Sequence, residues 1–212
     1  ASDKIAFGDK GLANIGKGFV KMGQSTSRSN RILMDLAKSH VILVAGKRGS
    51  GKSYTLGVLC EELSNLPSPL NKNVASLIFD TMGIYWTMKF PNEKDKELLT
   101  EWGLKPQRLP VKVFVPFGHY EKYIEGGIPV DEKFALSVME LKAEDWVLTF
   151  GLGIIDPVAI LIERTLSKIQ ELEDYNIKKI ISELEKDTTS DKETKNAAIG
   201  LFEAAETWGI FA

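Results

Sequence analysis

The chain has 212 residues, of which 43% are hydrophobic and 26% are charged, and its net charge is −2. This composition is ordinary for a globular protein and excludes a disordered, collagen-like or disulfide-stapled chain. Cys60 is the single cysteine, so an intrachain disulfide and a multi-cysteine metal site are both excluded. No apolar run approaches the roughly 18–20 residues that span a bilayer, and no signal peptide is evident, so we expect a soluble cytoplasmic protein without a membrane partner.

In chain order, residues 1–30 are rich in Gly, Lys and Ser and predict loops with one or two short strands. The continuous apolar run at 40–45 is typical of a strand buried on both faces of a parallel sheet. Similar runs alternate with helical patterns, which is the order of an α/β protein with a parallel sheet. The predicted strands are 31–36, 40–45, 74–79 and 111–116, and the predicted helices between them are 52–64 and 94–102.

After about residue 128 the sequence predicts helices only. Asp156 is a good N-cap because proline follows it at the first helical position. Ser190 with Glu193 fits a capping box, and Gly209 is placed to end the last helix. The predicted helices are 143–150, one from 157, 177–186 and 191–208. We therefore divide the chain into a basic N-terminal segment (1–30), the first half of an α/β core (31–127) and a helical subdomain (128–212).

Charge is distributed unevenly along the chain. Residues 1–53 carry ten Lys/Arg and three Asp, a surplus of +7, whereas the residues from 111 onward carry a surplus of −8. A solvated surface is the ordinary explanation of such runs, and a face that binds a polyanion is the alternative.

One motif dominates the sequence. It follows an apolar run, precedes a helix and matches GxxxxGK[ST] in full: Gly46-Lys47-Arg48-Gly49-Ser50-Gly51-Lys52-Ser53. In such a phosphate-binding loop the glycines let the backbone wrap around a phosphate, and N–H groups from Arg48 to Ser53 form an anion nest. Lys52 balances the charge of the β- and γ-phosphates, and the Ser53 hydroxyl ligates Mg²⁺. We therefore predict an ATP and Mg²⁺ site over residues 46–54, including Tyr54.

The carboxylates that would complete a hydrolytic site are harder to place. They normally follow four apolar residues as Asp or Asp-Glu, where the Asp holds the magnesium shell and the Glu activates water. Asp80 ends an apolar run but is not followed by an acid, and Asp156 fits a helix start better. Asp80 is thus the candidate metal ligand and, with Lys52, the candidate catalytic residue. The alternative is that the acidic pair lies beyond Ala212 and that the chain is truncated.

The chain resembles the HerA–FtsK group of ATPases over roughly residues 30–212, the N-terminal part of their ATPase domain. The resemblance is carried by the phosphate-binding loop, by VKVFVP and LKAEDWVLTFGL, and by Asp80, Gly83 and Tyr85 of a D-x-x-G-E-Y pattern. Ile84 replaces the Glu, so any role of that carboxylate is absent or moved. The resemblance implies a RecA-like P-loop fold with an α-helical insertion. It also implies an archaeal hexameric translocase or helicase that couples ATP hydrolysis to movement on DNA, with a nuclease partner.

Two other functions remain open from the residues themselves. A nucleotide or small-molecule kinase has a similar length and loop, but its lid needs several arginines, and here only Arg164 follows Arg108. A nucleotide-gated interaction module without turnover would use the helical part as its partner surface. His40 and His119 are expected to be structural or surface residues and Cys60 to be a core residue. Tyr85 is expected to pack, with base stacking as its alternative.

Overall fold

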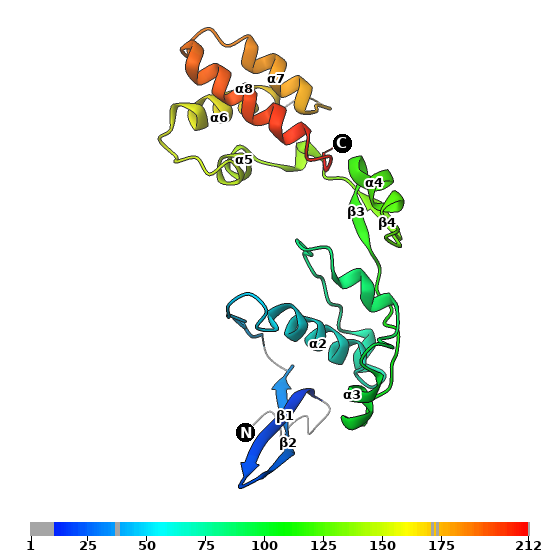
Figure 1. The fold of residues 1–212 in the computed structure, drawn as a ribbon. Coiled ribbons are helices and arrows are strands. Elements are labelled where there is room, and N and C mark those ends of the chain that lie inside the picture. Colours follow the sequence, from blue (N-terminus) through cyan, green and yellow to red (C-terminus); the bar gives the residue numbers. More distant parts are fainter. Residues whose placement is uncertain (1–10, 37–38, 171, 173, 212) are drawn as a thin grey trace. The chain divides into compact units, whose positions relative to one another are not determined.

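The computed structural model describes residues 11–36, 39–170, 172 and 174–211 (Figure 1). The chain divides into two compact units, one ending at Val111 and the other beginning at Lys112. The described residues form seven α-helices, α2–α8, with one antiparallel and one parallel two-stranded sheet. This confirms the α/β class. The predicted basic segment lies outside the described residues over positions 1–10.

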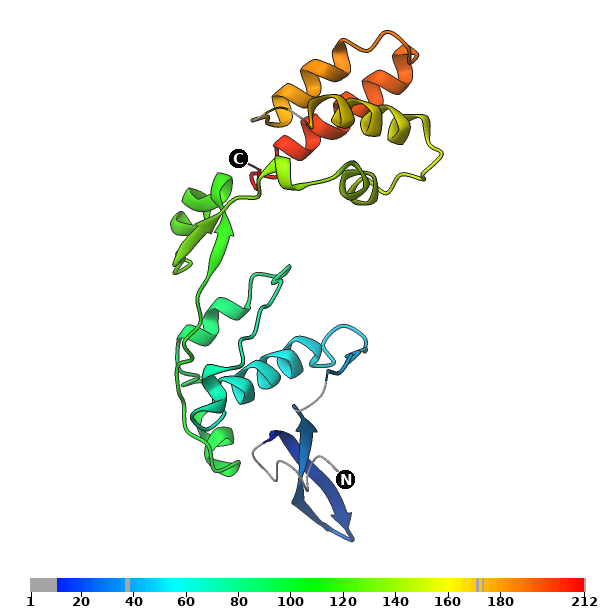
Figure 2. The same ribbon diagram turned by 180° about the vertical axis from the view of Figure 1, so that it is seen from behind.

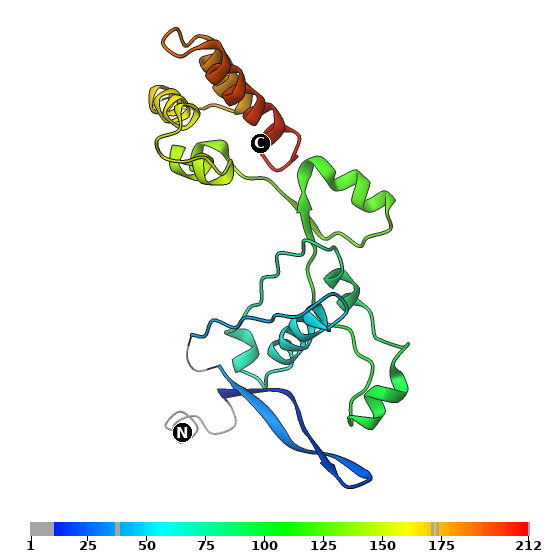
Figure 3. The same ribbon diagram turned by 60° about the vertical axis from the view of Figure 1, so that its left-hand side comes forward.

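The first unit begins with a long β-hairpin, visible in Figure 3. Strands β1 (Leu12–Met22) and β2 (Ser25–Asp35) pair antiparallel, and Gly23 turns the chain with φ of +62°. Two register shifts interrupt the pairing and increase the local twist. The sequence predicted shorter strands here because Gly, Ser and Lys favour strands weakly, and cross-strand pairing overrides that preference.

Helix α2 (Lys52–Ser64) follows in the first unit and contacts β1. The other elements are the 3-10 helices η2 (Leu70–Lys72) and η3 (Tyr85–Lys89) and helix α3 (Lys96–Glu101). Trp102 follows α3, and its ring receives Lys17 Nζ at 5.4 Å and the Arg28 guanidinium at 5.1 Å. Each such contact contributes about 0.5–1 kcal/mol at an exposed site, so Trp102 fastens the hairpin to α3.

Two of the predicted parallel strands do not form. Residues 40–45 and 74–79 carry no ladder hydrogen bonds in the described part of the chain, and most of their large apolar side chains are exposed, Leu43 to 88% and Phe79 to 86%. An apolar run becomes a strand only where another strand pairs with its N–H and C=O groups. The predictions for these two segments are therefore wrong for this structure, and the wider sheet of a RecA-like core stays a prediction.

The second unit begins with the parallel sheet. Strand β3 (Phe114–Pro116) pairs with β4 (Glu132–Phe134) through the 3-10 helix η4 (Phe117–His119) and helix α4 (Tyr120–Glu125). The predicted strand 111–116 is thus confirmed over its last three residues. The expectation of helices alone after residue 128 is wrong, since β3 offers an edge to β4.

The helical part matches its prediction closely (Figure 2). Its elements are η5 (Val138–Glu140), α5 (Ala143–Thr149), α6 (Pro157–Ile169), α7 (Ile177–Glu185) and α8 (Lys192–Glu206). Helices α6, α7 and α8 contact one another and bury a core that includes Trp146, Ile162, Ile180, Leu184 and Phe202. In the described part of the chain, no helix combines the length and the apolar character that a membrane crossing requires.

The starts of α6 and α8 depend on aspartates. Asp156 caps α6 by accepting the Val158 N–H at 2.8 Å, as predicted. The cap of α8 is Asp191, which accepts the Thr194 N–H at 2.9 Å. The predicted capping box at Ser190 is wrong, because the Ser190 hydroxyl instead accepts a hydrogen bond from Arg164.

The end of α8 is joined to the start of the same unit. The Gly118 N–H donates to the Gly209 carbonyl at 2.9 Å, and the Leu136 N–H donates to the Ile210 carbonyl at 2.6 Å. A Cβ atom on Gly118 would lie 2.7 Å from the Gly209 Cα, so this approach requires glycine. The predicted role of Gly209 as the cap of the last helix is wrong, because α8 ends at Glu206 and Thr207 is its C-cap, whereas Gly209, at φ of +62°, lies in the turn that follows.

Candidate nucleotide-binding site

The GxxxxGK[ST] residues form a tight loop that runs into the first turn of α2. Gly49 and Gly51 have φ values of +79° and +87°, a left-handed conformation that glycine adopts without strain. Gly51 precedes the first helical residue, and no side-chain hydrogen bond caps the helix there. The positive end of the helix dipole therefore has its first N–H groups available to an anion.

The loop is closed by its own backbone and by Lys52. The Ser50 N–H and the Lys52 ammonium both donate to the Lys47 carbonyl, at 3.1 Å and 3.0 Å. A Cβ atom on Gly46 would collide with the Ser50 hydroxyl, so a larger residue at that position would require the Ser50 side chain to move. An ammonium group has three donors, so Lys52 retains two for phosphate oxygens. The loop residues thus fit a bound polyphosphate.

The remaining predicted ligands are open to solvent. Lys47, Arg48, Ser53 and Tyr54 are exposed, Tyr54 to 65%. A hydroxyl that shares Mg²⁺ with phosphate oxygens and water has to be accessible, and Ser53 meets that condition. The described residues hold no group of three or more His, Cys, Asp or Glu that could bind a metal unaided. Magnesium at this loop would therefore depend on phosphate oxygens for part of its coordination.

Asp80 occupies a turn whose geometry explains the D-x-x-G-x-Y spacing. Its Oδ2 accepts the Tyr85 N–H at 2.8 Å, while the Gly83 N–H donates to the Asp80 carbonyl at 3.4 Å. Gly83 has φ of +64°, which favours glycine there. The other carboxylate oxygen, Oδ1, is buried and accepts no hydrogen bond from the described residues. A buried carboxylate oxygen without a donor is costly, and a cation would relieve that cost.

Tyr85 connects this turn to the phosphate-binding loop. Its phenol donates to the Ser53 carbonyl at 3.0 Å, across 32 positions of sequence. From the sequence, Tyr85 is expected to pack or to stack on a base, and this hydrogen bond is not predicted. The neighbouring Trp86 donates its Nε1–H to the Gly83 carbonyl at 3.0 Å, so it braces the same turn. The only sequence signal of the link is the spacing of Asp80, Gly83 and Tyr85.

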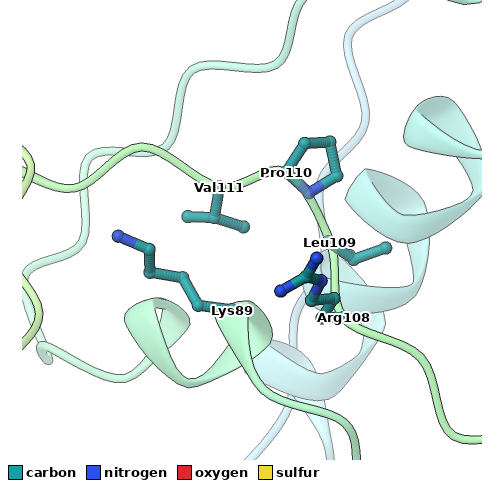
Figure 4. A pocket seen from close by; sticks show the side chains of 5 residues that line it. All are labelled: Lys89, Arg108, Leu109, Pro110 and Val111. Atoms are coloured by element: carbon teal, nitrogen blue, oxygen red, sulfur yellow. The ribbon is translucent and has the colours of Figure 1, made fainter.

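Two other features of the first unit lie outside this site. Burial raises the pKa of the Cys60 thiol, and a hydrogen bond with Ser76 offsets part of that rise, so Cys60 is a poor nucleophile. An open cleft of about 400 Å³ lies beside η3 (Figure 4). Leu109 donates its N–H to the Met88 carbonyl at 2.9 Å and closes one side of this cleft. The lining residues, none of them from the phosphate-binding loop, are Lys89, Arg108, Leu109, Pro110 and Val111.

Comparison with protein families identifies a match over most of the chain. The sequence profile of the family described as "Helicase HerA, central domain" matches residues 20–206. That span contains the phosphate-binding loop, the Asp80 turn and nearly all of the helical part. Comparisons with curated proteins and with solved structures found no match.

Proposed function

This chain belongs to the HerA central-domain family, and from that premise we propose that it binds Mg²⁺ and ATP at residues 46–54 as the ATPase domain of an oligomeric DNA translocase. Membership of the family supports an ATPase of the HerA/FtsK type. The observation that carries the assignment to this site is the closed loop, in which the Lys52 ammonium lies 3.0 Å from the Lys47 carbonyl.

In this proposal, each group of the site binds either the phosphates or the magnesium ion. The N–H groups of the loop and of the first turn of α2 hold the phosphates at the positive end of the helix dipole. Lys52 donates its two remaining N–H groups to phosphate oxygens, and the opposite charges strengthen these hydrogen bonds. The Ser53 hydroxyl and Asp80 hold Mg²⁺, which supplies charge stabilisation at the phosphates when bound.

The β-hairpin is the DNA-binding element in this proposal. Lys17 and Arg28 contact Trp102, and Arg28 also lies 3.3 Å from Glu101. Lys21 and Arg31, on the same hairpin, are exposed and make no such contact with the residues that the structure describes, so they are the cations best placed to neutralise phosphates. Movement on DNA further requires that several copies assemble.

Titration calorimetry of the chain with a non-hydrolysable ATP analogue and Mg²⁺ tests the site. Lys52→Ala should weaken binding at least about tenfold, because a charge-assisted hydrogen bond contributes about 1.5–3 kcal/mol. Lys94→Ala is the matched control, since Lys94 is an exposed lysine of the same unit. Unchanged affinity in Lys52→Ala would contradict the proposed site.

A further inference from the structure

Tyr85 contacts both sides of the proposed magnesium site through different atoms. Its phenol donates to the Ser53 carbonyl at 3.0 Å, and its backbone N–H donates to Asp80 Oδ2 at 2.8 Å. We infer that Tyr85 is a positioning residue that sets the separation of the Ser53 hydroxyl from the Asp80 carboxylate. This inference rests on the proposed function, in which those two groups hold the same ion.

The phenol bond acts on the first turn of α2. Ser53 is the second residue of that helix, so a hydrogen bond to its carbonyl fixes the turn from which the Ser53 side chain projects. The aromatic ring lies along the same helix, because a Cβ atom on Gly57 would come 3.9 Å from Tyr85 Cε1. A methyl group at position 57 would be in ordinary contact with the ring, and the ring brings the phenol to Ser53.

The backbone bond acts on the orientation of Asp80. With Oδ2 held by the Tyr85 N–H, the remaining oxygen Oδ1 is buried and accepts no hydrogen bond from the described residues. A cation would satisfy such an oxygen, so the unpartnered Oδ1 is a second, independent indication of a ligand. Tyr85 therefore fixes both the helix turn that carries Ser53 and the carboxylate that faces the ion.

The test compares nucleotide affinity in Mg²⁺ with affinity in EDTA, by titration of a fluorescent, non-hydrolysable ATP analogue. Tyr85→Phe keeps the ring and removes the phenol donor. We expect its affinity in EDTA to stay within about twofold of the unmodified chain. Its gain in affinity from Mg²⁺ should fall about three- to tenfold, the range that corresponds to one net hydrogen bond. Tyr123→Phe, in the other unit, is the matched control and should keep the full gain.

A second pair of variants tests the contact of the Tyr85 ring with α2 by changing position 57 of that helix. Gly57→Ala places a methyl group at ordinary contact distance from the Tyr85 ring and should leave the Mg²⁺ gain unchanged. Gly57→Leu adds a side chain that displaces the ring, so it should reduce the Mg²⁺ gain as Tyr85→Phe does. Circular dichroism of all variants checks that α2 is retained.

Three outcomes separate the hypotheses. A full Mg²⁺ gain in Tyr85→Phe overturns the positioning role, even if Lys52→Ala still abolishes binding and the nucleotide site stands. Equal losses in Mg²⁺ and in EDTA also overturn it, because they indicate a general structural role. If the unmodified chain binds no nucleotide, the site and the positioning role are both wrong.

Discussion

One guanidinium nitrogen of Arg164 lies 2.9 Å from Oδ1 of Asp187, and this bond joins α6 to the loop between α7 and α8. The Asp187 carboxylate is 6% exposed and also accepts the backbone N–H of Ser190 at 2.7 Å and of Thr189 at 3.2 Å. The backbone bond from Ser190, together with the hydroxyls of Thr189 and Ser190 and the positive Arg164, holds the pKa of Asp187 well below its usual range. A single carboxylate thus organises the turn that precedes α8.

Asp187→Asn should lower the melting temperature of the chain. The amide has one acceptor oxygen where the carboxylate has two, so it leaves either Arg164 or the loop N–H groups without a partner. Differential scanning calorimetry measures the change. Glu185→Gln, at an exposed position two residues away, is the control and should leave the melting temperature nearly unchanged. A decrease of equal size in both variants would contradict this role of Asp187.

Acid should destabilise the helical part through Glu183. Hydrogen bonds from Lys186 and Lys179, at 2.8 Å and 2.9 Å, lower the pKa of Glu183 from 4.5 to about 2. A carboxyl group whose pKa is lower in the folded state stabilises the fold above its unfolded pKa and loses that contribution as the pH falls through its folded pKa. Urea unfolding between pH 5 and about 2 should therefore show a smaller pH dependence in Glu183→Gln. An unchanged slope would contradict the prediction.

Phe202→Ala should cost about 3–5 kcal/mol of unfolding free energy, because truncating a buried phenylalanine leaves a cavity. Phe202 is fully buried, and its ring centroid lies 4.9 Å from that of Trp146 and 5.3 Å from that of Phe150. Leu148→Ala, at a side chain that is 80% exposed, should change the stability by less than about 0.5 kcal/mol. Urea titration followed by tryptophan fluorescence compares the two variants.

DNA binding should weaken steeply as salt increases. If Lys21 and Arg31 each neutralise one phosphate, Lys21→Ala and Arg31→Ala should each reduce the slope of log K against log salt concentration by about one. Fluorescence anisotropy at several salt concentrations gives the slope, and Lys94→Ala serves as the control. A slope that neither hairpin variant changes would place DNA binding elsewhere.

Slow ATP turnover is expected of the 212-residue chain. The first reason is that no acid follows Asp80 to activate water. The second is that, in related chemistry, an arginine supplied by a neighbouring subunit raises the rate about 10³–10⁵-fold, and a chain that does not assemble lacks this contribution. Phosphate release at saturating ATP should therefore stay close to that of Lys52→Ala. Fast release that Asp80→Ala removes would show instead that Asp80 suffices as the catalytic carboxylate.

The sequence predicted those features that depend on neighbouring residues. The glycine loop, helix α2 and the Asp156 cap are determined over a few positions, and all three are found where expected. Features that join distant segments were missed, as the hydrogen bond from Tyr85 to Ser53 illustrates. The apolar runs at 40–45 and 74–79 predicted strands because composition reports a preference for burial, whereas a strand also requires a pairing partner.

The contact of Gly118 with Gly209 determines where a shorter fragment of the chain can begin. A piece that begins at residue 128, the limit suggested by composition, would separate Gly118 from the carbonyl to which it donates at 2.9 Å. The same cut would remove β3, the partner of β4. A piece that begins at Lys112 keeps both contacts, so it is the better choice for expressing the helical part by itself.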